Sequence, residues 1–370
     1  MLSLRNFWRR HRKKIFVTVG VLGSGYALYK LYHGHKQRLS DLERELGSER
    51  ATDELIKAQL EAHFENIQRI ADSTTLPYSM HYLRSRISEE LDLSHLTTRL
   101  SQGKDQPNTL TSLEKLQLWD RLKILSFTRM ILSLWAMTML NLYIRVQVNI
   151  LGRHLYIDTA RGLEGSHLLE PTDPFDRHSH QEFLGTADYL SSYGMITLIS
   201  DMQAAASEVL KGKQLRDMFN TSLLHETIVH ILDVFMSLGG PNRWVTYLMP
   251  ENAIAYKHQM GTPSSALLPD VTKLDQLLVE THTVLLSDDF RNVVSISLRT
   301  VVDALMDDFG LQSGGNPSMG IPLAKLLPKV AQMDPLLLEE PGNNRFIQII
   351  RRSPEVELFY TLLYANMPPS

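Results

Sequence analysis

The chain has 370 residues, of which 43% are hydrophobic and 21% are charged, a balance typical of a globular protein that can bury a core. A formal net charge of −3 provides no overall field that would favour nucleic acid as a partner. There is no cysteine, which excludes disulfides, thiolate metal sites and cysteine nucleophiles.

A cluster of basic residues directly precedes the first apolar run. It lies in residues 1–14, at Arg9, Arg10, Arg12, Lys13 and Lys14. Residues 15–32 follow with a single charge, and as a helix they would span roughly 23–27 Å, the short edge of a bilayer core. A cleaved signal peptide would need a small-residue cleavage site that is missing, and a soluble core helix is disfavoured by three glycines without a polar face. The pattern favours one N-terminal transmembrane anchor.

Two long helical patterns follow the anchor. Residues 38–71 form the first, with Leu60, Phe64, Ile67 and Ala71 recurring on one side of an amphipathic helix. Residues 112–160 form the second, and its middle, "MILSLWAMTMLNLYI", is apolar nearly all round. A second membrane span and the central helix of a large bundle both explain this stretch. Only fifteen residues lie between the bounding arginines, Arg129 and Arg145, which favours the bundle.

The remaining patterns are also helical. They cover roughly 182–211, 213–237, 270–287, 289–309, 321–333 and 345–365, with loops expected at 161–180 and 239–265. The second loop is long and irregular, which is typical of a functional or mobile segment. Because no region alternates with a period of two, we predict an all-α fold: one large helical bundle over residues 33–370 with long central helices, preceded by the transmembrane helix.

Residues that could carry chemistry are scattered. His225 and His230 lie five apart, about 140° around a helix, so they cannot share one face as zinc ligands. Asp303, Asp307 and Asp308 could do acid–base work, but no nucleophile or metal partner accompanies them. The sequence predicts no catalytic residue, no metal site and no cofactor; a membrane-anchored hydrolase or metal enzyme that uses these groups is kept as a rival hypothesis.

The segment around Trp119 differs from this background. Leu118, Leu122 and Leu125 cluster on one helix face, whereas Trp119 lies outside that face with Lys115 and Lys123 one turn away on either side. An exposed tryptophan between lysines is typical of an interface hot spot whose charges attract an acidic partner. A tryptophan that caps the edge of the core explains the same pattern equally well.

Four stretches together resemble the peroxin-3 family along the whole chain: "FWRRHRKKIF" (7–16), "LWDRLKILSFTR" (118–129), "YIRVQVNILGRHLYID" (143–158) and "GIPLAKLLPKV" (320–330). The resemblance implies a non-enzymatic receptor in the peroxisomal membrane. It would dock peroxin-19, the soluble chaperone that delivers newly made peroxisomal membrane proteins, by binding an amphipathic helix of that partner in an apolar groove. Membrane lipid would be a further partner, and nucleic acid would not.

The resemblance also assigns residues. The family's groove tryptophan matches Trp119 and its neighbouring lysine matches Lys115. A groove leucine matches Leu100, and a position opposite the groove helix matches Leu155. The expected groove is completed by Leu116 and Lys123 from the same segment. The basic run from Arg9 to Lys14 matches the family's targeting segment.

The family resemblance and the positive-inside rule predict opposite membrane orientations for the N-terminus. Six Lys and Arg residues precede the apolar run and four follow it over the matching stretch, so the positive-inside rule would keep the N-terminus in the cytosol. The family places the N-terminus in the peroxisomal matrix and the helical domain in the cytosol, and we follow the family. A membrane-anchored lipid-binding or organelle-tethering helical protein is the alternative.

Overall fold

The computed structural model describes residues 68–105, 111–164, 174–240, 242–261, 271–312 and 320–365, together with Ala58, Ala62, Glu65 and Asn66. The predicted targeting segment 1–14, the anchor 15–32 and nearly all of the predicted helix 38–71 lie outside the described residues.

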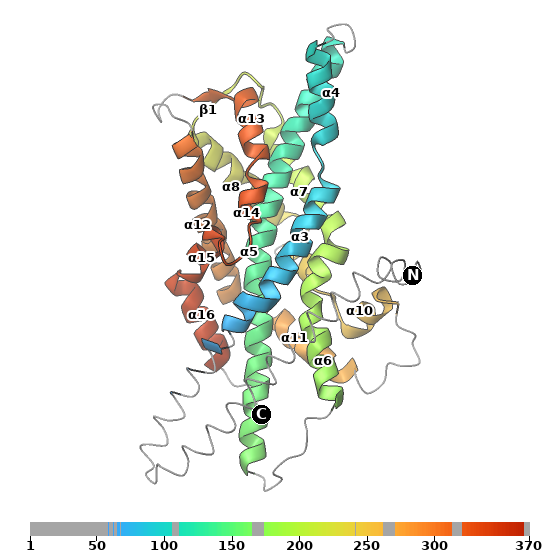
Figure 1. Ribbon diagram of the computed structural model, residues 1–370, viewed down its shortest axis with the longest axis vertical. Helices are drawn as coiled ribbons and strands as arrows, with labels where there is room; N and C mark the ends of the chain where they lie inside the picture. Colours follow the sequence, from blue (N-terminus) through green and yellow to red (C-terminus); the bar gives the residue numbers. More distant parts are fainter. Residues whose placement is uncertain are drawn as a thin grey trace, which may run out of the picture.

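The described part of the chain is built almost entirely of helices (Figure 1). The α-helices are α3 (Leu76–Glu90), α4 (Ser94–Asp105), α5 (Ser112–Glu164), α6 (Pro174–Gly185), α7 (Met195–Leu210), α8 (Thr221–Ser237), α9 (Val245–Leu248), α10 (Ala253–Gln259), α11 (Val271–Leu286), α12 (Asp288–Gln312), α13 (Leu323–Ala331), α14 (Asp334–Leu337), α15 (Arg345–Arg351) and α16 (Pro354–Ala365). A π turn, η1 (Ala71–Thr75), directly precedes α3. A 3₁₀ turn, η2 (Thr186–Asp188), and a second π turn, η3 (Leu190–Gly194), lie between α6 and α7. The predicted all-α class is confirmed.

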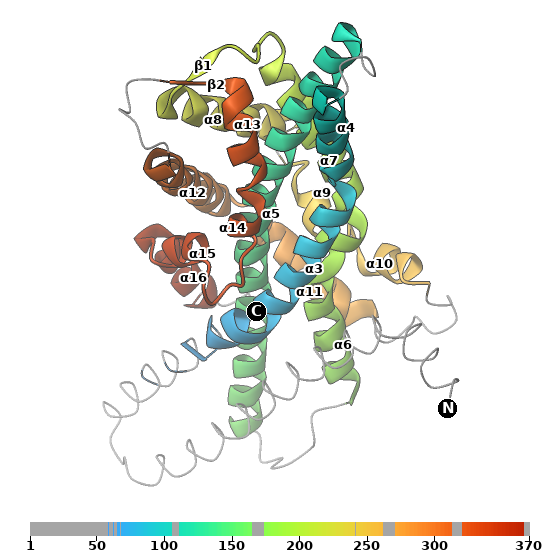
Figure 2. The same cartoon turned by 45° about the horizontal axis from the view of Figure 1, so that its top comes forward.

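Helix α5 is the axis of the body. In Figures 1 and 2, α12, α15 and α16 lie on one side of it, α7 and α10 lie on the other, and α3 crosses in front of it. Its apolar stretch is the one described segment long and apolar enough to cross a membrane, and that stretch is completely buried by the surrounding helices. The predicted central bundle helix is therefore confirmed, and the second membrane span is wrong.

Two polar groups of α5, the Gln147 side chain and the Leu142 carbonyl, form hydrogen bonds with neighbouring elements. The Gln147 side chain donates to the carbonyl of Phe183 and to the hydroxyl of Thr186, each at 2.8 Å, and the Tyr360 hydroxyl donates to the carbonyl of Leu142 at 2.7 Å. Because a buried polar group is costly without a hydrogen bond, these contacts fix how α6, η2 and α16 pack on the axis.

Three local features differ from the prediction. The pattern over 182–211 is interrupted by η2 and η3, where Gly194 passes so close to α9 that a Cβ would lie 2.2 Å from the carbonyl oxygen of Tyr247. The pattern over 213–237 begins only at Thr221, because β1 (Met218–Phe219) pairs antiparallel with β2 (Ile321–Pro322). The segment 239–265, expected to be a functional or mobile loop, contains α9 and α10 in its described part and packs Trp244 and Tyr247 into the core.

Candidate functional site

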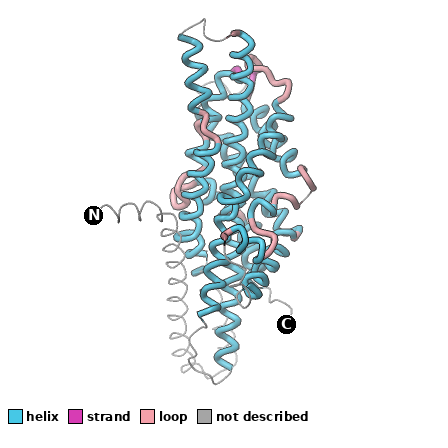
Figure 3. The backbone as a smooth tube through the Cα atoms, turned by 90° about the vertical axis from the view of Figure 1, so that its right-hand side faces the viewer, coloured by secondary structure: helices cyan, strands magenta, loops and turns pink. Residues whose placement is uncertain are grey.

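Helices α4 and α5 form a hairpin at one end of the body. The end of α4 and the start of α5 reach beyond the neighbouring helices, at the upper end of the molecule in Figure 1, and Figure 3 shows the same extension from the side. Four leucines, Leu93, Leu96, Leu118 and Leu122, pack between the two helices in a small cluster separate from the main core. We call these four residues the tip cluster, because they hold the two arms of the hairpin together.

Side-chain caps fix where both helices of the hairpin begin. Thr111 and Glu114 form a capping box: the backbone N–H and the hydroxyl of Thr111 each donate to the Glu114 carboxylate at 2.8 Å, and the N–H of Glu114 donates back to the Thr111 hydroxyl at 3.2 Å. Before α4, Asp92 accepts from the hydroxyl and the N–H of Ser94, at 2.6 and 2.9 Å. These hydrogen bonds hold the pKa values of both carboxyls below their ordinary values.

Large apolar side chains beside the tip cluster face solvent. Leu113 is 65% exposed and Leu116 is 54% exposed, and Trp119 and Leu100 are half-buried against the tip cluster. Leu113, Leu116 and Trp119 recur every three residues, so they follow one another along one side of α5. Lys115, one turn before Trp119, is partly exposed next to them. We call these five residues the tip surface.

The tip surface combines exposed apolar area with a rigid support. Its side chains stand on two capped helices that the tip cluster holds together, so they are ordered before any partner arrives. An exposed apolar patch of this kind can bury its area only against another molecule, and an amphipathic helix presents a complementary stripe. The tip surface can therefore bind an amphipathic helix of a partner, and none of its five residues forms a nucleophile–base pair that would suggest covalent chemistry.

Lys123 does not belong to the exposed surface, contrary to our prediction. Its side chain is buried, and its ammonium donates to the carbonyls of Lys213 at 2.7 Å and Leu210 at 3.4 Å while pairing with Asp120 at 3.1 Å. The turn after α7 covers it. Lys123 therefore fastens that turn to α5 and cannot attract an acidic partner.

Leu155 is also not part of the tip surface. It lies on α5 itself, 36 residues after Trp119, which places it about 54 Å along the helix axis from that residue. It packs against the main core instead. The prediction that Leu155 lies opposite the groove helix is wrong, because Leu155 and Trp119 are on the same continuous helix.

The His and Asp residues that the rival enzyme hypothesis would use form surface contacts and ion pairs or are exposed. His225 and Asp303 contact each other across α8 and α12 at 2.9 Å on the surface, and Asp308 pairs with Arg345. Asp307 is exposed. In the part of the chain that the structure describes, no group of three His, Asp or Glu side chains is arranged to hold a metal ion.

Leu113 is the residue that our sequence reasoning missed. The signal was present in its spacing, since it precedes Leu116 by three residues just as Leu116 precedes Trp119. The start of α5 at Ser112 makes it the first large side chain of the helix, and therefore the one furthest out on the hairpin.

The fold and the site define an all-α protein that carries an ordered apolar surface at one end of its central helix. Comparison with known proteins then identifies the family. The family model described as Peroxin-3 matches residues 104–366. Peroxisome biogenesis protein 3-2 of Arabidopsis thaliana is 57% identical over 99% of both chains, and peroxisomal biogenesis factor 3 of Homo sapiens is 28% identical over 98% of this chain and 96% of its own.

The chain belongs to the peroxin-3 family. Membership places it among peroxisome biogenesis factors, a family that is associated with the peroxisomal membrane and is not known as an enzyme family. The relative from Yarrowia lipolytica, at 23% identity, is similar over 98% of this chain, so the likeness extends beyond the residues that the family model matches.

Proposed function

We propose that this protein is a peroxisomal membrane receptor that docks peroxin-19 and its cargo of membrane proteins, and that the tip surface binds an amphipathic helix of peroxin-19. The observation that carries the proposal is the exposure of Leu113 and Leu116 beside Trp119 at the free end of α5. Family membership supplies the biological setting, peroxisome biogenesis.

Apolar burial would provide most of the binding energy. A partner helix lying along the tip surface would cover the two exposed leucines and the open side of Trp119, and aromatic residues at the centre of an interface contribute most to affinity. Of the two lysines that flank Trp119, only Lys115 is available at the surface, so it would steer an acidic segment of the partner and affect the association rate more than the affinity.

The position of the tip supports a receptor oriented away from the membrane. The chain enters the described body at η1, where Asp72 pairs with Arg351 of α15, and α3 then leads to α4 at the opposite end (Figure 1). With the anchor in residues 15–32, the N-terminus in the matrix and residues 33–370 in the cytosol, the tip surface would face the soluble chaperone. The basic run from Arg9 to Lys14 would serve targeting.

A binding measurement on the full chain tests the proposal. Full-length protein in nanodiscs would be immobilised and titrated with the N-terminal helix peptide of peroxin-19, by bio-layer interferometry. We expect Trp119→Ala to lose at least ~2 kcal/mol, about thirtyfold in Kd, the range of an interface hot spot. Leu358→Ala is the matched control, since Leu358 is 59% exposed on α16. An unchanged Kd for a folded Trp119→Ala variant would reject the tip surface as the docking site.

A further inference from the structure

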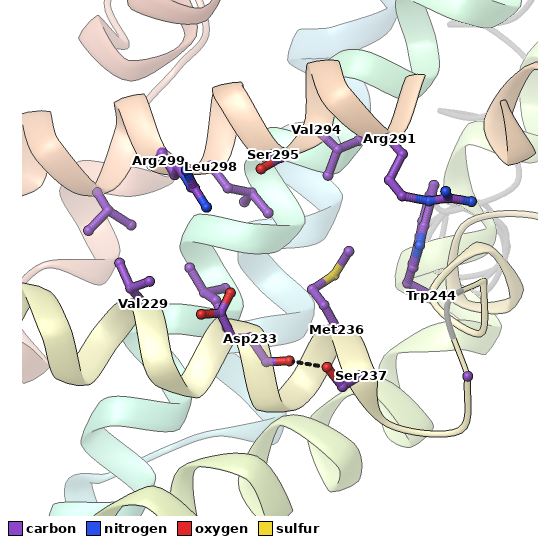
Figure 4. Close-up of a pocket in the computed structure, with 13 residues that line it drawn as sticks. Val229, Asp233, Met236, Ser237, Trp244, Arg291, Val294, Ser295, Leu298 and Arg299 are labelled. Carbon is purple, nitrogen blue, oxygen red and sulfur yellow. Dashed lines mark hydrogen bonds between the residues drawn. The ribbon is translucent and has the colours of Figure 1, made fainter. Parts of the chain in front are cut away.

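A cavity of about 440 Å³ lies between α8 and α12, and none of its lining residues belongs to the tip surface (Figure 4). Its volume falls within the range of small-molecule sites. Residues 229–237 of α8 and 291–302 of α12 line it, so it extends for roughly 12–16 Å along the helices. The indole of Trp244 closes one end.

The apolar floor of this cavity is recessed. Leu232, Val294, Leu298 and Val302 are each buried, and Val229 and Met236 are only partly exposed at the entrance. A ligand therefore reaches the buried floor through the partly exposed entrance between α8 and α12. A slender, flexible chain can enter, and Met236 can adjust to it because its thioether side chain is unbranched.

Two opposite charges flank the cavity. Asp233 of α8 and Arg299 of α12 are both exposed and point toward each other across it, yet they form no ion pair in the described structure (Figure 4). The other arginine of the lining, Arg291, is already committed to Asp288 at 2.6 Å and to Asn242 at 3.2 Å. Arg299 and Asp233 are therefore the charges available to a ligand.

We propose that this cavity binds a single-chain amphiphile with a zwitterionic head group, of the lysophosphatidylcholine kind. The phosphate would pair with Arg299 and the ammonium with Asp233, which fills the gap between two facing charges without leaving either unpaired. The acyl chain would lie along Met236 and Val294 toward Trp244, where each buried CH₂ adds to binding. This site is independent of the tip surface and of peroxin-19.

Photo-crosslinking on the full chain in amphipol tests the site. The probes are lysophosphatidylcholine with a diazirine near the end of its acyl chain and the matching diazirine fatty acid, with labelled peptides located by mass spectrometry. We expect the first probe to label peptides of α8 and α12, and Arg299→Glu to reduce this labelling about fivefold. Asp233→Lys should reduce labelling by lysophosphatidylcholine and increase labelling by the fatty acid.

Both variants change exposed side chains, so the fold should be retained, which thermal unfolding checks. Glu226→Lys on α8 and Lys325→Glu on α13 are the matched controls, because they alter exposed charges outside the cavity and should leave labelling unchanged. Labelling that spares α8 and α12, or that ignores both variants, would overturn the proposal. Increased labelling by both probes in Asp233→Lys would overturn the zwitterionic assignment.

Discussion

Leu116 and Leu118 lie two residues apart on α5, and changing each to alanine should affect a different property: partner binding for Leu116 and stability of the fold for Leu118. Leu116 is 54% exposed on the tip surface, whereas Leu118 is 9% exposed within the tip cluster. The two side chains point about 200° apart around the helix. Truncating the first therefore removes area that only a partner covers, and truncating the second removes part of what holds the hairpin together.

The structure sets the size of both effects. Complete burial of a leucine side chain contributes ~1.5–3 kcal/mol, and about half of Leu116 is left for a partner to bury, so Leu116→Ala should weaken binding by ~1–1.5 kcal/mol, about five- to tenfold in Kd. Its free energy of unfolding should change by less than ~0.5 kcal/mol. Leu118→Ala should reduce the free energy of unfolding by ~2 kcal/mol, the lower end for a buried leucine, because the tip cluster is small.

Titration with the peroxin-19 helix peptide and urea unfolding of the same samples would separate the two effects. Leu358→Ala, at an exposed leucine of α16, controls for the loss of any surface leucine and should change neither quantity. The reasoning would be refuted if Leu116→Ala lowered the unfolding midpoint while leaving Kd unchanged, because Leu116 would then face the body rather than a partner.

Three further results should follow from the contacts of this structure. Lys115→Gln should slow association with an acidic partner mainly at low salt, which stopped-flow measures. Lys123→Gln should instead lower the midpoint of urea unfolding at all salt concentrations, because the buried ammonium of Lys123 holds the turn after α7. Arg129 is largely buried and pairs with Asp334 at 2.7 Å, so Asp334→Ala leaves a buried charge without its partner and should reduce the free energy of unfolding by ~3–5 kcal/mol. A loss below ~1 kcal/mol in urea unfolding would contradict this. Burial raises the pKa of Asp188 to about 6, above its unfolded value, so the native state binds the extra proton and stability falls as pH rises from about 4 to about 6. Asp188→Asn should therefore stabilise the protein by about 3 kcal/mol at pH 7.5 and about half as much at pH 5, and a gain independent of pH would refute the cause.

The fold class and the central helix could be predicted because their signals are local. A stretch such as Met130 to Ile144, apolar on all sides and free of proline, must be buried by protein or lipid. Because only fifteen residues lie between the bounding arginines, a helical bundle is the better explanation. The capping box formed by Thr111 and Glu114 likewise involves only groups within four consecutive residues. For such features the sequence contains all the interacting groups.

Features that depend on distant parts of the chain could not be predicted in the same way. Lys123 and Lys115 flank Trp119 symmetrically in the sequence, yet only Lys123 is covered, by carbonyls about 90 residues further along. The pairing of β1 with β2 joins residues about 100 positions apart, and no periodic pattern signals it.

Trp119 combines a feature that the sequence predicts with one that depends on distant packing. One interpretation of the sequence makes it an exposed hot spot and the other makes it a cap on the core edge. The structure places it half-buried against the tip cluster while Leu113 and Leu116 beside it are exposed, so each interpretation describes one side of the indole. Only the packing of Leu96 of α4 and of Leu93, which directly precedes α4, separates the covered side from the open one.

Because the chain has no cysteine, protection of a single introduced thiol tests the docking surface most directly. Leu113→Cys and Leu358→Cys each place one thiol at a strongly exposed leucine, at the tip and on α16. The full chain in nanodiscs would be reacted with a maleimide, with and without saturating peroxin-19. The docking account predicts that peroxin-19 slows labelling of Leu113→Cys at least tenfold and leaves Leu358→Cys unchanged. Equal rates with and without peroxin-19 at position 113, in a sample where binding is verified, would contradict it.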